Sequence, residues 1–366
     1  MTFSVPHWWR RPTRIGGDKR RPGHQSGCRP CLEILEQRCV PSVTIHEFLT
    51  PSSGGGPQGI TIGPDGNLWF AESGGGNIGE INAHTHAIQE FPLNTSTSGH
   101  FPLRITSGPD GNLWFTDTVF TNLGVTASIG EINPFTHAIQ EFPIAPPSNS
   151  PVTPVGIAPG LDGNLWFTEF DGNQIGEINP FTHAIHQFPI PTPGSGPFGI
   201  TPGLDGNLWF TESGAATIGE INPFTHAIRE FPLPTANSAP LNITFGLDGN
   251  LWFTDFSGQI GEINPFTHAV QEFAIPAINS QPFGITFGPD GKLWFTDLNG
   301  SIGQINPFTH TIQEFAVPAP GPNLFPEPWL ITFGPDGTLW FTDLGTNGIG
   351  EVQIFHNSGL LVPSSA

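Results

Sequence analysis

The sequence predicts an all-β protein: a seven-bladed β-propeller of four-stranded antiparallel blades, with the ring closed by the N-terminal strand. Three observations predict this fold. Each repeat before the last contains four short apolar runs separated by turn residues. The strand type that the last repeat lacks is present before the first one. The tripeptide Leu-Trp-Phe recurs at a regular period, at 68–70, 113–115, 165–167, 208–210, 251–253, 293–295 and 339–341.

The fourth repeat shows the expected strands of one blade. They are residues 199–201, 207–211, 218–221 and 227–231. An Asp-Gly turn joins the first two runs, where glycine accepts a positive φ without strain. Asn222-Pro223 begins the turn before the last run, because proline presets φ there. No repeat carries a helical pattern of ten residues, so every element is expected to be a strand.

Two segments could complete the last blade. The last repeat loses its pattern after Val352, and residues 360–362 offer a local fourth strand. Residues 44–48, Thr-Ile-His-Glu-Phe, match the fourth strand of the other repeats better. The sequence therefore favours ring closure by the N-terminal strand.

The charges divide the chain into a basic leader and an acidic body. Residues 1–42 hold eight of the 11 Lys and Arg residues, whereas the remainder holds three bases and 28 acids. An acidic surface repels phosphate backbones, so we expect no nucleic-acid partner. A cationic ligand or a metal ion would suit this body better.

The chain is expected to comprise a basic leader at 1–42, disordered or processed, a propeller at 43–354 and a tail at 355–366. The leader holds all three cysteines, Cys28, Cys31 and Cys39, which lack a well-placed fourth zinc ligand. Residues 32–42, LEILEQRCVPS, resemble a leader motif at the start of many exported proteins of one bacterial phylum. That resemblance implies export or a cell-surface location. No stretch is apolar for long enough to span a membrane.

Three repeated polar positions invite a chemical interpretation. The histidines of the NPFTH turns, and His86 at the same place in the first blade, are too far apart to share an ion and are expected to be turn residues; the NPFTH histidines are His137, His183, His226, His268 and His310. A single Asp in each GPDG-type turn, as at Asp65, lacks the ligand count of a calcium site.

The third position follows W-F-T or W-F-A and is always acidic. Each carboxylate either accepts hydrogen bonds from its own loop or contributes to a negative ring around one mouth of the channel. The residues are Glu72, Asp117, Glu169, Glu212, Asp255, Asp297 and Asp343.

The repeated sequence motifs resemble those of the virginiamycin B lyase (streptogramin lyase) family. They are P-x-G-I-T, G-P-D-G-x-L-W-F-T-E, I-G-x-I and I-x-E-F-x-[LI]-P. The resemblance covers residues 44–352, nearly the whole body. It implies a seven-bladed propeller that opens the lactone of type B streptogramins by a magnesium-dependent elimination.

The resemblance breaks at the family's active site. There the final blade begins Glu-Pro-His-Gly-Ile, with the Glu as metal ligand and the His as base. Here the same place reads Glu327-Pro328-Trp329-Leu330-Ile331. The family's second, substrate-contacting His aligns with Phe283. Its second metal-binding Glu aligns with Leu344, one residue after Asp343. The resemblance thus leaves Glu327 and Asp343 as metal candidates, possible magnesium as cofactor, and no catalytic residue.

The residue after Pro in the seven first strands is never ionisable, so the ring offers no positioned base. His100 is the nearest histidine, and a lone loop histidine is more often structural. These seven residues are predicted to line a substrate- or ligand-binding mouth: Gln58, Leu103, Val155, Phe198, Leu241, Phe283 and Trp329.

Two functions follow from these observations. The first is a monomeric, exported, non-catalytic propeller that binds a small ligand, a glycan or a protein at its channel mouth through the variable face. The mouth would suit an apolar or aromatic group carrying a positive charge, beneath an acidic rim. The alternative is a magnesium-dependent carbon–oxygen lyase of the virginiamycin B lyase type with a rearranged site.

Overall fold

The computed structural model describes residues 42–93, 99–121, 124–146 and 152–355. These residues belong to one compact unit, Pro41–Asn357. The predicted leader, apart from Ser42, and the predicted tail, apart from Phe355, lie outside the described residues. The described part contains no helix that is long and apolar enough to cross a membrane.

The described strands form seven four-stranded antiparallel sheets, which confirms the predicted fold class. The first three blades are β2 (Pro57–Ile62), β3 (Leu68–Glu72), β4 (Asn77–Ile81) and β5 (Ile88–Pro92); β6 (Gly99–Ser107), β7 (Leu113–Thr121), β8 (Gly124–Ile132) and β9 (Ile139–Pro143); and β10 (Pro154–Pro159), β11 (Leu165–Glu169), β12 (Gln174–Ile178) and β13 (Ile185–Pro189). The next two are β14 (Pro197–Pro202), β15 (Leu208–Glu212), β16 (Thr217–Ile221) and β17 (Ile228–Pro232); and β18 (Pro240–Phe245), β19 (Leu251–Asp255), β20 (Gln259–Ile263) and β21 (Val270–Ala274). The last two are β22 (Pro282–Phe287), β23 (Leu293–Asp297), β24 (Ser301–Ile305) and β25 (Ile312–Ala316); and β26 (Pro328–Phe333), β27 (Leu339–Asp343), β28 (Gly348–Phe355) and β1 (Ser42–Leu49).

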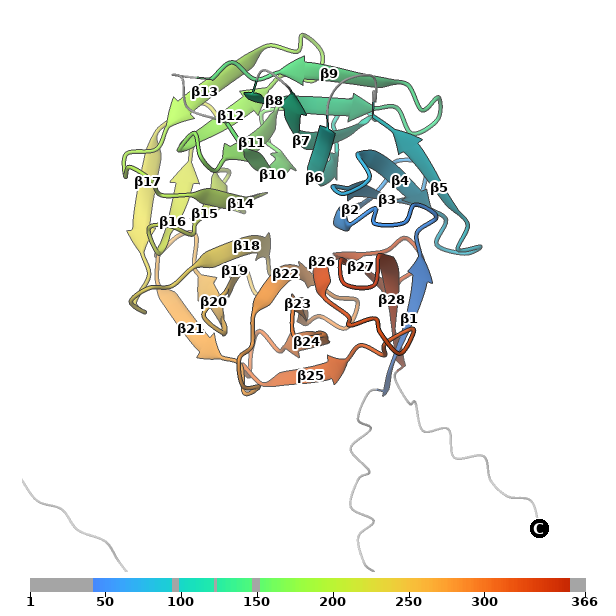
Figure 1. The fold of residues 1–366 in the computed structure, drawn as a ribbon. Coiled ribbons are helices and arrows are strands. Elements are labelled where there is room, and N and C mark those ends of the chain that lie inside the picture. The colour runs from blue at the N-terminus through green and yellow to red at the C-terminus, as the bar shows by residue number, and fades with distance from the viewer. Residues whose placement is uncertain (1–41, 94–98, 122–123, 147–151, 356–366) are drawn as a thin grey trace, which may run out of the picture. The chain divides into compact units, whose positions relative to one another are not determined.

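The blades surround a central axis, with the first strand of each blade innermost and the fourth at the perimeter (Figure 1). The seventh blade takes its outer strand from the N-terminal end of the propeller. β1 pairs with β28 from Ser42 opposite Phe355 to Leu49 opposite Gly348. The predicted closure of the ring is therefore confirmed.

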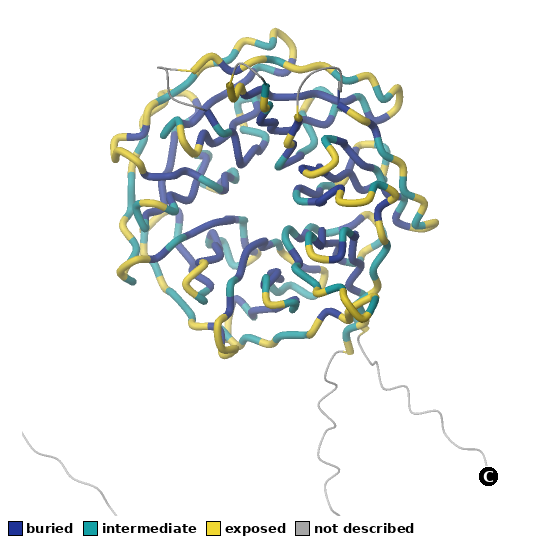
Figure 2. The backbone as a smooth tube through the Cα atoms, in the orientation of Figure 1, coloured by how far each residue is buried: buried dark blue, intermediate teal, exposed yellow. Residues whose placement is uncertain are grey.

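The Leu-Trp-Phe tripeptides build the interface between neighbouring blades. Trp69 of the first blade packs in one cluster with Leu113 and Phe115 of the second. The seven Trp side chains of these tripeptides are fully buried. Figure 2 shows buried backbone in every blade and exposed backbone mainly in the loops and along the perimeter. Burying one such side chain contributes about 1.5–3 kcal/mol. Each indole N–H also donates to the Asp of its GPDG-type turn, at 2.9–3.2 Å, so these aspartates are turn residues as predicted.

The NPFTH histidines connect each blade to the one before it. His268 has a left-handed φ of 59° and stacks on Phe231 of the preceding blade with ring centroids 4.3 Å apart. Its Nε2 lies 4.0 Å from a carboxylate oxygen of Glu220 in that blade. The predicted turn role is confirmed, and inter-blade packing is added to it. The Phe of the same turn, Phe266, remains 65% exposed.

Candidate functional site

The predicted mouth residues lie on the innermost strands, near the end where each strand begins. Each strand is anchored to the blade before it by a Thr of the W-F-T sequence, whose hydroxyl donates to the backbone carbonyl of a mouth residue. These bonds measure 2.6–3.0 Å and are made by Thr116, Thr168, Thr211, Thr254, Thr296 and Thr342. Ala71 takes this place in the first blade, so Leu103 receives no such bond there. The mouth is therefore positioned by a nearly continuous ring of hydrogen bonds.

The aromatic members of the predicted mouth meet one another. Phe198 and Phe283 form an edge-to-face pair with centroids 5.8 Å apart. Trp329 lies against Phe283 at 4.0 Å. These three come from the fourth, sixth and seventh blades, so they join across the channel as well as around it. Gln58 instead donates to the Ser73 hydroxyl of its own blade, at 2.7 Å. Val155 and Leu241 are buried, and Leu103 is half-buried.

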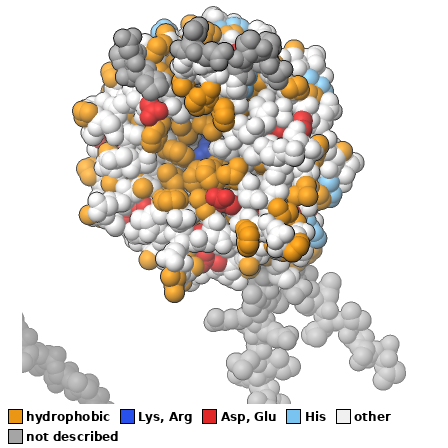
Figure 3. All heavy atoms as spheres, viewed as in Figure 1, with side chains coloured by type: hydrophobic (Ala, Val, Ile, Leu, Met, Phe, Trp, Pro, Cys, Tyr) orange, Lys and Arg blue, Asp and Glu red, His pale blue; other side chains and the backbone are white. Residues whose placement is uncertain are grey.

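Arg104, from the second blade, occupies the middle of this aromatic cluster. Its guanidinium carbon lies 5.4 Å from the centres of the Phe198 and Phe283 rings, in cation–π geometry. Its Nη2 donates to Asn242 Oδ1 at 3.3 Å. Figure 3 shows a basic side chain at the centre of a hydrophobic patch on this face.

The charge of Arg104 is poorly compensated. Burial lowers the pKa of its guanidinium to about 9. Among the described residues, no carboxylate lies within ion-pair distance of Arg104, and its Nη1 has no hydrogen-bond partner. The buried indole Nε1 of Trp329 also lacks a partner there. Buried donors normally find acceptors, so two donors are left for an acceptor group from outside.

The acidic residues after W-F-T are buried, so the expected acidic rim is wrong. All seven side chains have no exposed surface. The aspartates accept loop N–H groups: Asp297, for example, accepts from Gln281 and Asn299, both at 3.0 Å. Hydrogen bonding to the backbone of the loops, the first of the two alternatives, therefore describes the four aspartates, whereas neither carboxylate oxygen of Glu212 has a hydrogen-bond partner among the described residues. These seven residues therefore offer no exposed carboxylate to a cationic ligand at the mouth.

The two metal candidates lie at the entry to the seventh blade. Asp343 Oδ1 accepts the backbone N–H groups of Glu327, at 2.9 Å, and Thr346, at 3.0 Å. Burial raises the pKa of the neighbouring Glu47 to about 8, and the nearby carboxylate of Asp343 adds to this rise. Neither candidate belongs to a group of three converging ligands among the described residues. Magnesium needs near-octahedral oxygen coordination, so two carboxylates would supply only part of a magnesium site and water molecules would have to supply the rest.

Arg104 is not among the residues predicted from the sequence, because those are the residues directly after Pro and Arg104 is one position further on. That next position is glycine in four blades. A Cβ added at Gly284 would lie 2.7 Å from the Trp329 carbonyl of the neighbouring blade, so glycine permits close packing there. In the sequence, the exceptions are Arg104, Asn242 and Leu330. A comparison of the second residue after Pro in the first strand of all seven repeats could have found Arg104.

Comparison with known proteins identifies close relatives of this propeller. The model of the virginiamycin B lyase family matches residues 37–183 and 127–358. A streptogramin B lyase structure superposes with a TM-score of 0.72 at 32% identity, covering 86% of this chain and 98% of that one. A catalytically inactive His-to-Ala variant of virginiamycin B lyase from Staphylococcus aureus, with quinupristin, also has a TM-score of 0.72, at 31% identity; the match covers 86% of this chain and 100% of that one.

More distant structures share the fold alone. The extracellular domain of a putative hybrid two-component system from B. thetaiotaomicron matches with a TM-score of 0.66 at 17% identity, covering 87% of this chain and 43% of that one. Comparison with curated protein sequences gives no match.

Proposed function

We propose that this chain, which belongs to the virginiamycin B lyase family, is a non-catalytic propeller that binds a small organic anion with an aromatic or apolar body at its channel mouth. The observation that carries the proposal is the uncompensated Arg104 guanidinium among Phe198, Phe283 and Trp329. Of the partner classes open to a propeller mouth, a small ligand matches this enclosed cluster best.

Each part of the cluster has a separate role in the proposed complex. A ligand carboxylate accepts from Arg104 Nη1 and supplies the negative charge that the buried cation lacks. The half-buried indole of Trp329 gives a stacking surface, and its Nε1 gives a second donor. The backbone at both residues is fixed before the ligand arrives, by Thr296 donating to the Trp329 carbonyl and by the Arg104 N–H donating to Thr116 Oγ1 at 3.2 Å, which lowers the entropic cost of binding.

A thermal-shift and fluorescence screen tests this proposal. The probes are aromatic carboxylates, each paired with the neutral amide and the amine of the same skeleton. A ligand that binds only the folded chain raises its melting temperature. We expect the carboxylates to do so and the amines not to.

Two variants locate the binding. Arg104→Met keeps the volume and removes the charge, so it should abolish the preference for carboxylates; the exposed Arg229→Met is the matched control. Trp329→Phe should weaken the binding of all aromatic probes and remove their effect on indole fluorescence. Equal binding of amines and carboxylates, or a carboxylate preference that survives Arg104→Met, would refute the proposal.

The second candidate is a lyase with a rearranged site, and family membership together with the retained Glu327 favours it. Against it stand Phe283 and Trp329 at the two positions where the family resemblance implies histidines. The variant that changes Phe283→His, Trp329→His and Leu344→Glu together tests whether the mouth keeps lyase geometry. Residues that act as a unit are not additive, so single changes are less informative. Weak, magnesium-dependent opening of a type B streptogramin is the expected gain.

We further propose that the chain binds magnesium, is exported and is monomeric. Magnesium binding at Glu327 and Asp343 is tested by calorimetric titration of the chain and of Glu327→Gln with magnesium chloride. Export rests on the leader motif at 32–42 and is tested by fractionating cells that express the full chain. A monomeric state is tested by light scattering after gel filtration.

A further inference from the structure

The second blade differs from the other six at one position. The residue two before the Pro of the first strand is serine in three blades, at 195, 238 and 280. In two of these blades the serine hydroxyl holds the loop in place: Ser280 donates to Asp297 Oδ2, and Ser238 Oγ donates to Glu272 at 3.3 Å. The Ser195 hydroxyl has no hydrogen-bond partner among the described residues. In the second blade, the same position is His100. It is buried, and it replaces a hydroxyl with an imidazole, which is the commonest metal ligand among side chains.

Two carboxylates converge on this imidazole. His100 Nδ1 lies 2.6 Å from Asp117 Oδ2 and 3.4 Å from Glu141 Oε1. These ligand atoms all lie within 4.8 Å of one another, and among the described residues no other three potential metal ligands converge in this way. Asp117 follows the W-F-T of its blade, and Glu141 comes from the outer strand β9, so the blade itself holds the three together.

A fourth polar group at the same place lacks a partner. Ser128 lies directly opposite Asp117 in the pairing of β7 with β8, so both side chains project from the same face of the sheet. The Ser128 residue is only 6% exposed, and its hydroxyl oxygen has no hydrogen-bond partner among the described residues. A buried hydroxyl of this kind calls for an acceptor or a cation.

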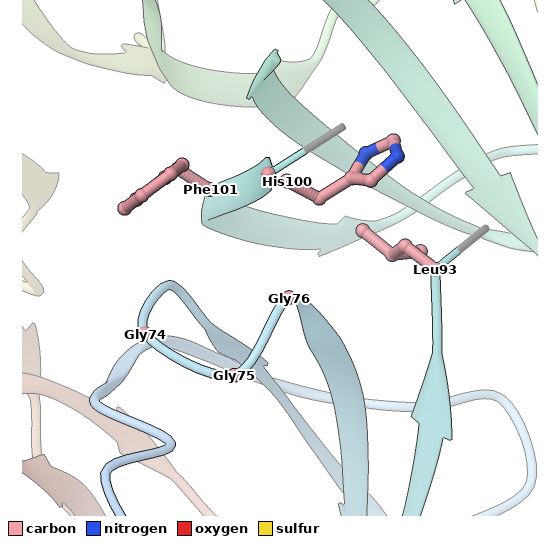
Figure 4. A pocket seen from close by; sticks show the side chains of 7 residues that line it. Gly74, Gly75, Gly76, Leu93, His100 and Phe101 are labelled. Carbon is pink, nitrogen blue, oxygen red and sulfur yellow. The ribbon is translucent and has the colours of Figure 1, made fainter. Parts of the chain in front are cut away.

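A pocket of about 140 Å³ adjoins the cluster. Figure 4 shows His100 and Phe101 projecting to different sides of their strand above the Gly74–Gly76 loop, with Leu93 near the imidazole. Since a water molecule occupies about 30 Å³ in the liquid, the pocket has room for the waters that would complete a coordination sphere.

We propose that His100, Asp117 and Glu141 form a binding site for a divalent transition-metal ion, with Zn²⁺ as the best probe. One imidazole and two carboxylates suit zinc and manganese better than magnesium. Ligand atoms at zinc bond lengths of about 2.0–2.2 Å are roughly 3.3–3.6 Å apart in a tetrahedron. The Nδ1–Oε1 separation already has this value. The shorter Nδ1–Oδ2 contact is a hydrogen bond, and the metal ion would displace its proton. The two atoms would then have to move apart by no more than about 1 Å to reach the spacing of metal ligands.

Calorimetric titration with zinc chloride tests the site on the full, metal-stripped chain. The three leader cysteines are first alkylated, because thiolates bind zinc. We expect one equivalent of zinc to bind. Cobalt in place of zinc should give the visible absorption of a low-symmetry, four- or five-coordinate ion. His100→Ser and Glu141→Gln each install the residue that another blade carries at that position, so both should fold and both should lose at least tenfold in affinity.

The exposed His186→Ala is the matched control. His186 also pairs with a carboxylate, Glu177 at 2.8 Å, but no third ligand joins them among the described residues. Its removal should leave zinc affinity unchanged. The proposal is overturned if the parent chain binds no zinc at millimolar concentration. It is equally overturned if His100→Ser binds zinc as tightly as the parent, because His100 would then only fasten the loop, as serine does elsewhere.

Discussion

At the scale of single residues, the NPFTH turn shows how position overrides hydropathy. The polar His268 packs between blades, whereas the apolar Phe266 beside it is exposed. The reason is the left-handed conformation at the histidine, which turns its ring back onto Phe231 of the preceding blade.

His268→Ala should lower the free energy of unfolding by about 1–2 kcal/mol. The substitution removes an aromatic contact worth about 0.5–1.5 kcal/mol and leaves alanine in an unfavourable left-handed conformation. His268→Asn is the control, since asparagine tolerates that conformation and loses only the ring contact. Urea unfolding of the three chains measures the difference. An alanine variant as stable as the parent would show that the stacking is not stabilising.

Buried carboxyl groups make the stability depend on pH. Burial raises the pKa of Glu212 to about 8 and that of Glu169 to about 7, against an ordinary value of 4.5. A folded-state pKa above the unfolded value stabilises the fold fully below pH 4.5, and this contribution is lost as the pH rises to about 8. The melting temperature should therefore fall between about pH 5 and about pH 9.

Glu212→Gln should flatten this pH dependence, because its amide stays neutral throughout. Asp171→Asn, at an exposed side chain, is the control and should keep the parent slope. A melting temperature that rises with pH over this range would contradict the assignment of neutral buried carboxyls.

At the scale of elements, the repeated pattern makes the fold predictable from the sequence but gives little information about the candidate site. Strand type, turn chemistry and the closing strand at 44–48 could all be predicted, because seven copies repeat the same pattern. The site depends on departures from the pattern at single positions. The Phe283 and Trp329 departures were visible beside the family motif, whereas Arg104 and His100 act through residues in distant strands. Their contacts are set by the closing of the ring and the pairing of strands, which no local pattern encodes.

Removal of β1 tests the closing strand. A chain that begins at Pro51 loses all eight pairs with β28 and exposes that strand as a sheet edge. Exposed edges pair with other chains, so this variant should melt at a markedly lower temperature and should associate. A chain that begins at Ser42 is the control and should melt and elute as the full chain does. Unchanged melting and elution of the shorter chain would mean that β1 does not hold the ring closed.

At the scale of the whole molecule, the ring brings seven similar strands to one axis and lets single substitutions there define the function. Arg104 and Trp329 are on the second and seventh blades, and Phe198 is on the fourth, yet all contribute to one cluster. Under the proposed function, a binding mouth replaces a catalytic one on the same seven-bladed scaffold. The charge of Arg104, left without a carboxylate among the described residues, is what distinguishes this mouth chemically.

The most direct test of the central claim, that the mouth binds but does not catalyse, is a turnover assay with a type B streptogramin. The full chain is incubated with quinupristin and excess magnesium, and ring opening is followed by mass spectrometry beside the Staphylococcus aureus lyase and a buffer control. Loss of a general base alone costs on the order of 100- to 10,000-fold. We predict a rate equal to that of buffer for the parent chain and for Trp329→Ala. Turnover by the parent chain that Trp329→Ala abolishes would contradict the account.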